Sequence, residues 1–432
     1  MSTNTPSYGK FVQWLPMIVI QLYLTLTVSA FAFGPWPWPV YDPTKLYSFL
    51  IAAQVALLLG YAIAIRRAPT KGMSMPRFRT YFFYALLLNI LFVVPTAKAR
   101  TGAWIPDIAG ALADPGEAYS KSLDIRTNTP GPIEYLRVLL GPILFLTIPW
   151  AIYYWRSLSR LEQVGFVVYI GLWMGVAIGT GTRKALADLL IVAPWMILAG
   201  RISGHSRWTG SAARIPLILG GAGAYGFVQY FTTGQLTRHG GGAAAGTFGG
   251  IPIVADFEHW TVSGLSPLMK IAATQLVLYT TQGYYALGLA LEKPWVPMFG
   301  VGHSTFLFRN VARILGTPEL GEMPYPVRVT AQDGWDHLHL WDTIYPWLAS
   351  DLSFPGTVVF MFFIGRLLGG SWKDSLGGRN PLAVAVVAQL LVLAFYIPAN
   401  NQCCQDGEGF VAFYVLIAIW LLTRSALEPE VR

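Results

Sequence analysis

Charge is scarce in this sequence. Lys, Arg, Asp and Glu make up only 12% of its 432 residues, whereas apolar residues make up 54%. A soluble protein carries about twice that share of charge, and the mean hydropathy of +0.48 points the same way. Basic side chains interleaved with stacking aromatics are also lacking, so we expect no nucleic-acid partner. The composition excludes a soluble globular domain and predicts an all-α, polytopic integral membrane protein.

Cysteine is nearly absent, since the adjacent pair Cys403 and Cys404 is all the chain has. This pair excludes a framework of disulfides. We interpret it as two small residues in a short loop, with a vicinal redox pair as the alternative. The first apolar run, which follows Lys10, is longer than the apolar core of a secretory signal, and this length predicts an uncleaved first helix.

Apolar runs of about 20 residues, the length that crosses a bilayer, recur along the chain. We expect about ten (10–12) transmembrane helices, at 11–33, 46–65, 80–96, 135–155, 164–181, 184–200, 215–231, 346–370, 381–399 and 409–424.

Basic residues gather in every second connection between these runs. The loop 66–79 holds five of them, and the loops after the fourth, sixth and eighth runs hold two or three each. The positive-inside rule therefore places these loops and both termini in the cytoplasm. The net charge of +8 then reflects topology rather than a partner.

Two long segments fall on the opposite, outer side. Segment 97–134 contains "IPDIAGALADPGEAY", where we expect a short amphipathic helix. Segment 232–345 includes the Gly-rich "RHGGGAAAGTFGG", interpreted as a mobile lid or linker. Its apolar run 268–291 is long enough to span, but a crossing there would break the alternation of loops. We expect that run to rest in the interface or to re-enter the membrane.

The sequence is thus divided into three parts. Residues 1–231 form an N-terminal transmembrane bundle of about seven spans, 232–345 a large outer loop with interfacial helices, and 346–432 the C-terminal transmembrane helices.

The stretch "GTGTRKALADLL" (179–190) places two cations, Arg183 and Lys184, at the start of a helix on the outer side. The helix dipole disfavours cations there, and short outer loops usually lack them. A phosphate would suit both the free N–H groups and the guanidinium. The alternative is that Lys184 pairs with Asp188 and that Arg183 extends to lipid headgroups.

A second cluster of polar residues lies in "QDGWDHLHLWDTIYPWLASDLSFPG" (332–356). A histidine here could act as a general base on a sugar hydroxyl. In extended chain, His337 and His339 would point to one side, which would suit zinc. Because no further cluster completes a metal shell, we expect neither a metal nor another cofactor. The alternative is a polar loop whose histidines pair with its own aspartates.

Between these stretches lies "VGHSTFLFRNVARILG" (301–316), an expected interfacial helix. Arg309 and Arg313 are four residues apart and share one face. They could hold a diphosphate or contact headgroups.

Two stretches resemble a known family, the bacterial O-antigen and exopolysaccharide repeat-unit polymerases (Wzy-type). "GTGTRKALADLLIVAPWMILAG" resembles the family's segment that ends one helix with Gly-Thr-Arg and begins the next. "WDTIYPWLASDLSFPGTVVFMFFIGRLLGG" resembles its "T…DFGxxG…G" segment. Here the chain departs from the pattern, with Leu-Ser-Phe-Pro-Gly after Asp351 in place of Phe-Gly. The order of basic loops, Arg-bearing helix and large outer loop also matches.

The resemblance implies a metal-independent membrane glycosyltransferase in the bacterial inner membrane, with its active site facing the periplasm. Its donor would be a polyprenyl-diphosphate-linked oligosaccharide, whose repeat units it polymerises into O-antigen, capsule or exopolysaccharide. Cations near the diphosphate would stabilise the leaving group. Further partners would be membrane lipids and a chain-length regulator protein.

We assign roles on this basis. Arg183 is the expected primary diphosphate ligand. His337 or His339 is the expected base, oriented by Asp342, with His303 in reserve. The remaining expected substrate-binding residues are Lys184, Arg309, Arg313, Arg328, Asp351, Tyr279 and Tyr285.

Other functions remain open at this point. An O-antigen ligase shares this layout but passes its glycan to lipid A core. A lipid or oligosaccharide transporter would carry ionisable residues inside its spans. The expected spans carry charge mostly at their ends, apart from Asp188 and Asp351, which favours an enzyme.

Overall fold

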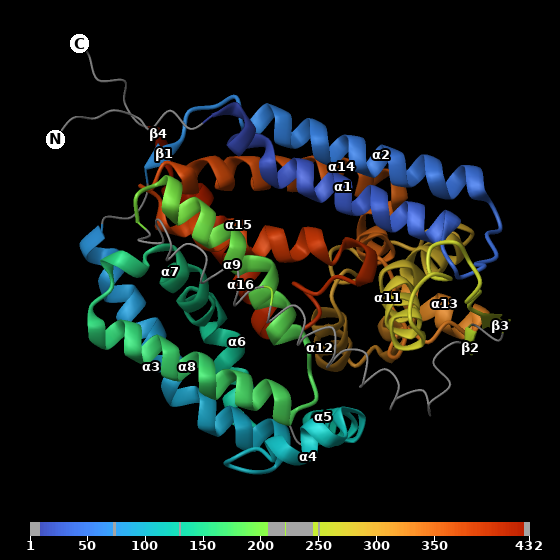
Figure 1. The fold of residues 1–432 in the computed structure, drawn as a ribbon, viewed down its shortest axis with the longest axis horizontal. Coiled ribbons are helices and arrows are strands. Elements are labelled where there is room, and N and C mark those ends of the chain that lie inside the picture. The colour runs from blue at the N-terminus through green and yellow to red at the C-terminus, as the bar shows by residue number, and fades with distance from the viewer. Residues whose placement is uncertain are drawn as a thin grey trace.

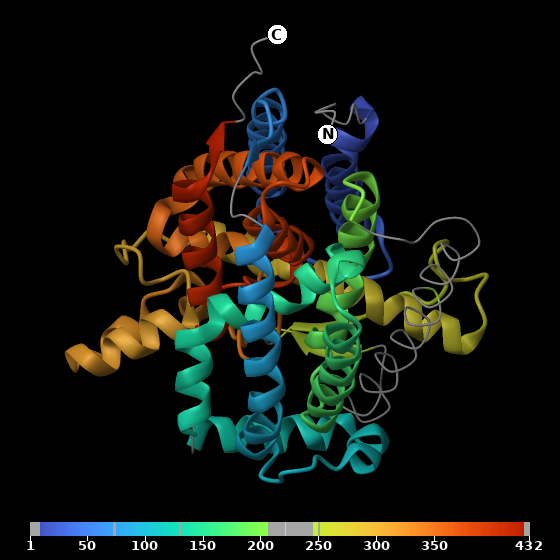
Figure 2. The same ribbon diagram turned by 90° about the vertical axis from the view of Figure 1, so that its left-hand side faces the viewer.

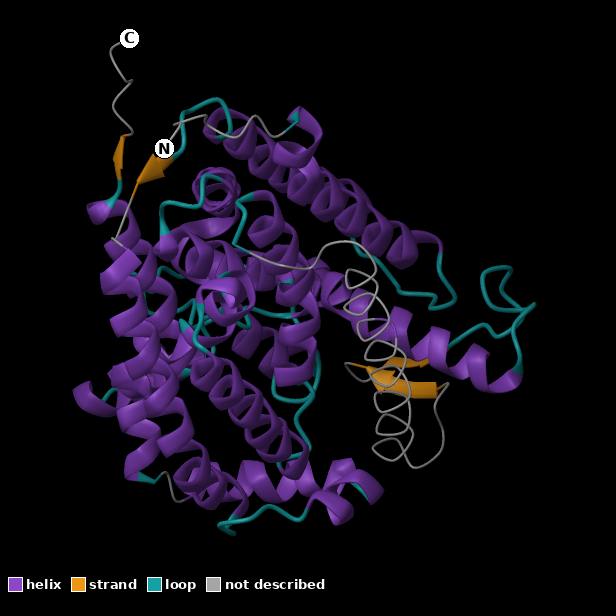
Figure 3. Ribbon diagram, turned by 60° about the vertical axis from the view of Figure 1, so that its left-hand side comes forward, coloured by secondary structure: helices purple, strands orange, loops and turns teal. Residues whose placement is uncertain are grey.

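The computed structural model describes residues 9–71, 75–128, 131–205, 221, 245–248 and 251–426. Helices dominate these residues (Figure 1; Figure 3), and the strands among them form two short antiparallel pairs. One pair joins β1 (Thr70–Lys71) to β4 (Ser425–Ala426), and the other joins β2 (Ala245–Phe248) to β3 (Ile251–Val254). The expected helical class is confirmed.

Seven stretches of the described chain are helical, long and apolar enough to cross a membrane. They are α1 (Lys10–Phe33), α2 (Pro43–Ala64), α3 (Met75–Thr101), α6 with α7 (Pro132–Phe145 and Thr147–Tyr153), α8 (Arg160–Gly179), α9 (Lys184–Ile202) and α14 (Ile344–Leu376). The shorter apolar helices α15 (Pro381–Phe395) and α16 (Gly407–Thr423) follow. Of the expected span 215–231, only Gly221 lies among the described residues. Over the described residues, these features fit a multi-pass membrane protein with seven long apolar helices, and α15 and α16 coincide with two of the other expected spans.

Capping residues determine where several helices begin and end. The side chains of Asp42, Asn380 and Asp406 each accept a backbone N–H from the first turn that follows. The first two are followed by proline, which has no N–H to satisfy. Helix α12 (Thr305–Leu315) ends at Gly316, whose φ of 66° is a left-handed conformation that glycine adopts without strain.

The turns between helices gather at two ends of the bundle. At the first, which we call the basic end, segments 65–71, 154–160, 202–205, 376–380 and 424–426 meet. Asp374 there accepts hydrogen bonds from the backbone N–H and the hydroxyl of Thr70, and His205 Nε2 lies 3.2 Å from the carbonyl of Gly378. The other end, the loop end, holds 34–42, 102–128, 180–183, 251–343 and 396–406. The alternation expected from the loop charges is therefore present in the fold.

Helix α14 packs along α2 through glycines. A Cβ atom added to Gly60 would lie 1.9 Å from the carbonyl oxygen of Phe362, and one added to Gly365 would lie 2.0 Å from that of Leu57. Small residues allow membrane helices to approach this closely. The first and last parts of the sequence therefore share one core.

Helix α11 (Pro267–Leu291) is not among the seven stretches apolar enough to span. Its first half accepts a hydrogen bond from the Trp36 indole at the Thr274 carbonyl, and Glu292 beyond its end pairs with Lys45 at 3.1 Å. The first half of α11 thus contacts the connection between α1 and α2, and the residue after its last turn contacts the first turn of α2. Figure 1 views α11 nearly along its axis while α1 and α2 lie across the picture, and Figure 2 shows it running sideways. This agrees with the expectation that 268–291 does not span.

The loop end carries the remaining short helices. They are α4 (Ile108–Ala113), α5 (Pro115–Asn128), α12, η3 (Pro318–Glu322), α13 (Tyr325–Asp333) and η4 (Ile397–Ala399), whereas η1 (Trp155–Ser157) lies at the basic end. Helix α12 projects from the bundle in Figure 2 and exposes Ile314 and Leu315. The helices expected within 97–134 and 301–316 are both present.

Candidate active site

The most completely built polar site at the loop end pairs His303 with Asp351. His303 Nδ1 lies 2.7 Å from Asp351 Oδ2, and the two side chains are only 13% and 5% exposed. The sequence placed these residues in separate roles, as reserve base and substrate ligand, whereas the structure joins them. A carboxylate on Nδ1 fixes the imidazole tautomer and its orientation.

A tight turn of backbone surrounds the Asp351 carboxylate. The backbone N–H groups of Gly300 and Gly302 donate to Oδ1 and that of His303 donates to Oδ2, each at 2.9 Å. Gly300 has φ 91° and Phe299 has φ 51°, so the chain wraps around the carboxylate in a conformation that few residues adopt. With His303 Nδ1, four donors stabilise one ionised carboxylate.

The bend that presents Asp351 lies inside α14. Ser353 has φ 62° and ψ 168°, which is not helical, and Pro355 follows it. Proline lacks an N–H and disrupts the helix that precedes it. The departure from the family pattern after Asp351 therefore falls at the bend itself.

The second nitrogen of His303 contacts Tyr414 of α16. The Tyr414 hydroxyl lies 2.8 Å from Nε2. In the neutral imidazole whose Nδ1–H donates to Asp351, Nε2 carries the lone pair and accepts from the phenol. Asn401 binds the backbone carbonyl of His303 at 2.9 Å. Sequence reasoning missed Tyr414, since nothing in "GFVAFYVLIA" distinguishes it from an apolar lipid-facing residue.

The cations at the start of α9 are at the same end of the bundle. Lys184 forms an ion pair with Asp188 at 2.6 Å, which is the local pairing that the sequence offered as an alternative. Asp406, just before α16, is among the charges that act on Lys184. Arg183 is the residue that precedes α9 and is half-buried. Both cations lie opposite the basic end.

Two further ion pairs tie the surrounding helices together. Arg100 of α3 holds Glu134 of α6 at 2.7 and 3.1 Å. Arg137 of α6 holds Glu408 of α16 at 2.9 and 2.8 Å. These pairs were missed, although Arg137 lies inside the expected span 135–155, where an arginine is unusual enough to be a signal.

The histidines favoured by the sequence have other partners. His339 pairs with Asp336 at 2.5 Å in an exposed turn, and His337 Nδ1 lies 2.7 Å from the Thr330 hydroxyl. Residues 337–339 form a turn rather than the extended chain that would align their rings. Burial lowers the pKa of His337. Asp342 contacts neither ring, so its expected orienting role finds no hydrogen bond here.

Asp342 is buried, with only 2% of its surface exposed. Its Oδ1 has no hydrogen bond within the described chain. Burial raises its pKa to about 8. At neutral pH this side chain is therefore mostly a neutral acid.

The expected arginines of the outer loop are dispersed. Arg309 and Arg313 are exposed on α12, and neither forms an ion pair within the ranges that the structure describes. Arg328 Nε donates to the carbonyl of Met323, and its guanidinium lies 4.6 Å from the Tyr325 ring centroid. These side chains could receive an anion at the surface.

The expected sugar-stacking tyrosines are packed among other aromatics. Tyr285 is 3% exposed and stacks on Trp38 with ring centroids 5.4 Å apart. Tyr279 contacts the Trp341 ring edge-on at 5.3 Å. A sugar would have to displace an aromatic neighbour to stack on Tyr285.

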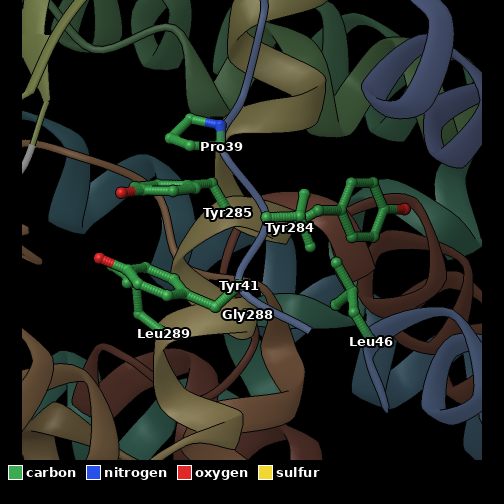
Figure 4. A pocket seen from close by; sticks show the side chains of 8 residues that line it. Pro39, Tyr41, Leu46, Tyr284, Tyr285, Gly288 and Leu289 are labelled. Carbon is green, nitrogen blue, oxygen red and sulfur yellow. The ribbon is translucent and has the colours of Figure 1, made fainter. Parts of the chain in front are cut away.

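A small groove of about 160 Å³ lies beside Tyr285. It is lined by Pro39, Val40, Tyr41, Leu46, Tyr284, Tyr285, Gly288 and Leu289. Figure 4 shows the hydroxyls of Tyr41 and Tyr285 extending to one side and that of Tyr284 to the other. The groove lacks the cations and the His–Asp pair, so it does not coincide with the polar site.

The described residues bring no three histidine, cysteine or acidic side chains together in a way that could hold a metal ion. Cys403 and Cys404 are buried and unlinked. The chemistry available at the loop end is therefore a fixed imidazole beside an ionised carboxylate, with cations on neighbouring helices. Comparison with protein-family models, curated proteins and solved structures found no match to this chain.

Proposed function

We propose that the protein is a membrane glycosyltransferase that uses a lipid-linked, diphosphate-activated oligosaccharide. It joins repeat units by transferring the growing glycan to a sugar hydroxyl of a second lipid-linked unit. The basic end faces the cytoplasm and the loop end faces the periplasm. The His303–Asp351 pair is the observation that carries this proposal.

His303 acts as the general base on the acceptor hydroxyl. Asp351 is its positioning residue, because the carboxylate holds Nδ1–H and leaves the lone pair on Nε2. A neutral, oriented imidazole beside a carboxylate is the arrangement that proton abstraction from a hydroxyl requires. His303 replaces His337 and His339 as our preferred base, since their hydrogen bonds join them to Thr330 and Asp336.

Arg183 binds the diphosphate of the donor. Its position before the first turn of α9 adds free backbone N–H groups to the guanidinium. The charge of the departing diphosphate grows in the transition state, so a cation at this position favours reaction over simple binding. Lys184, already paired with Asp188, contributes less.

Purified protein in lipid vesicles, incubated with polyprenyl-diphosphate-linked repeat units, tests the proposal. We expect a ladder of glycans on a gel, lost in Arg183→Ala and partly retained in Arg183→Lys. Arg66→Ala, which removes a cation at the basic end, is the matched control and should leave the ladder intact. Wild-type protein that binds the donor but forms no new glycosidic bond would overturn the proposal. Supplying lipid A core as acceptor separates a polymerase from a ligase.

A transporter is the second candidate, and one observation favours it. The Arg137–Glu408 pair joins α6 and α16 near the loop end, with Arg137 only 9% exposed, and transporters often keep such buried ionisable groups. In the same vesicles a transporter would move the lipid-linked glycan between leaflets without lengthening it.

A further inference from the structure

The Tyr414 hydroxyl is hydrogen-bonded to Nε2 of His303, the nitrogen that would accept the proton in general-base catalysis. Its distance to Nε2 is 2.8 Å, while Nδ1 is engaged by Asp351 at 2.7 Å. No substrate hydroxyl can reach the lone pair of Nε2 while the phenol donates to it. Tyr414 therefore blocks access to Nε2 of the proposed base, and we call this hydrogen-bonded arrangement the cover of His303.

Tyr414 lies on the less buried face of α16. It is 37% exposed, whereas the next residue toward the helix start, Phe413, is 3% exposed. Its ring packs against Phe410, with centroids 4.8 Å apart, and against His303 at 5.8 Å. Its hydroxyl also forms a hydrogen bond with the Cys404 side chain, so a rotamer that frees Nε2 gives up that contact as well.

We propose that the Tyr414 hydroxyl holds the position of the acceptor hydroxyl and is displaced by it. The acceptor then approaches along the exposed face of α16, which suits a hydroxyl carried by a molecule anchored in the bilayer. This inference rests on the proposed function.

The acceptor O–H gives its proton to His303 Nε2 as its oxygen bonds to the anomeric carbon of the donor. The bond between that carbon and the diphosphate oxygen breaks, and the diphosphate leaves with the electron pair. The imidazolium then loses its proton to solvent, and Tyr414 returns to Nε2.

Tyr414→Phe tests the cover without any substrate. The ring is kept and only the hydroxyl is lost, so diethylpyrocarbonate should modify His303 faster, by about fivefold, the factor that one neutral hydrogen bond is worth. Modification is read on the His303 peptide by mass spectrometry in vesicle-embedded protein. Tyr135→Phe, on an exposed tyrosine of α6, is the matched control and should leave the rate unchanged. Equal rates in Tyr414→Phe and wild type would overturn the cover.

Transfer kinetics test the acceptor position. With lipid-linked acceptor, Tyr414→Phe should lower KM and keep kcat, because the acceptor no longer competes with the phenol. Loss of turnover in Tyr414→Phe would show instead that the phenol relays the proton, which contradicts the proposal. Faster labelling of His303 with no transfer by the wild type would reject the proposed function and the acceptor position, while leaving the cover itself supported.

Discussion

Asp342 and Asp351 are both buried, yet they differ in charge. Asp342 lies just before α14, and Asp351 lies nine positions further on, inside that helix. Asp351 is surrounded by three backbone N–H groups and the His303 imidazole. Asp342 lacks a hydrogen bond at Oδ1 within the described residues, and burial raises its pKa to about 8. Burial penalises a charge, and donors decide whether the penalty is offset. The donors around Asp351 therefore keep its carboxylate ionised, whereas Asp342 remains a neutral acid.

Neutralising Asp351 should have the largest effect. Asp351→Asn keeps the shape but removes the charge that orients His303, and we expect the single-turnover transfer rate to fall by about 10²–10⁴-fold. Donor binding, measured separately, should change little. Asp336→Asn is the matched control, because it removes the carboxylate from the other His–Asp pair, that with His339. A larger loss in the control would reverse the roles of the two pairs.

Asp374, at the basic end, is a third buried carboxylate. Like Asp351 it accepts several hydrogen bonds, but none of them comes from a histidine. It accepts from the Thr70 backbone and hydroxyl and from the Trp420 indole at 3.1 Å. Asp374→Ala leaves these donors unsatisfied, and we expect a loss of about 3 kcal/mol in the free energy of unfolding. Denaturant unfolding in detergent measures it. The folded fraction should transfer glycan at the normal rate, and a specific loss of turnover would contradict a structural role.

Asp342→Asn should stabilise the protein at alkaline pH. The folded pKa lies above the unfolded value, so the wild type loses stability as pH rises from about 4 to about 8, by at most about 1.4 kcal/mol per pH unit from this group. The amide cannot ionise and removes that slope. We expect the two proteins to differ little in stability at pH 4, and the advantage of the variant to widen with each pH unit up to about pH 8. Parallel stability profiles for the two proteins would show that Asp342 is ionised in the fold.

Lys184→Gln should have the smallest effect on stability. The Lys184–Asp188 pair is partly exposed, with side chains 39% and 24% accessible. Pairs of this kind contribute about 0.2–1 kcal/mol. The midpoint of unfolding in detergent should therefore move little. A loss as large as that expected for Asp374→Ala would mean that this pair holds α9 in place.

The helical class and the separation of the two ends were predictable, because long apolar runs and alternating basic loops report directly on the membrane. The location of α11 was also predictable from the same alternation. The lengths of the last two helices were not, since α15 and α16 have only 15 and 17 residues. Hydropathy sets approximate boundaries and cannot show where a helix ends within the core.

The sequence was enough to identify His303 and Asp351 as site residues, but not to show that they contact each other. The sequence identified His303 and Asp351, yet 48 positions separate them and a local pattern favoured His337 with Asp342. The bend at Ser353 and the turn at Phe299 bring the first pair together, and both depend on tertiary contacts. Tyr414 gave no signal because a tyrosine among apolar residues is commonly a membrane anchor.

The central claim is that Asp351 holds His303 as the base, and matched histidine variants test it most directly. Single-turnover transfer is compared for His303→Gln and His337→Gln with the donor saturating. The account predicts a fall of about 10²–10⁴-fold for the first and a change of no more than a few-fold for the second. Wild-type turnover in His303→Gln would contradict it.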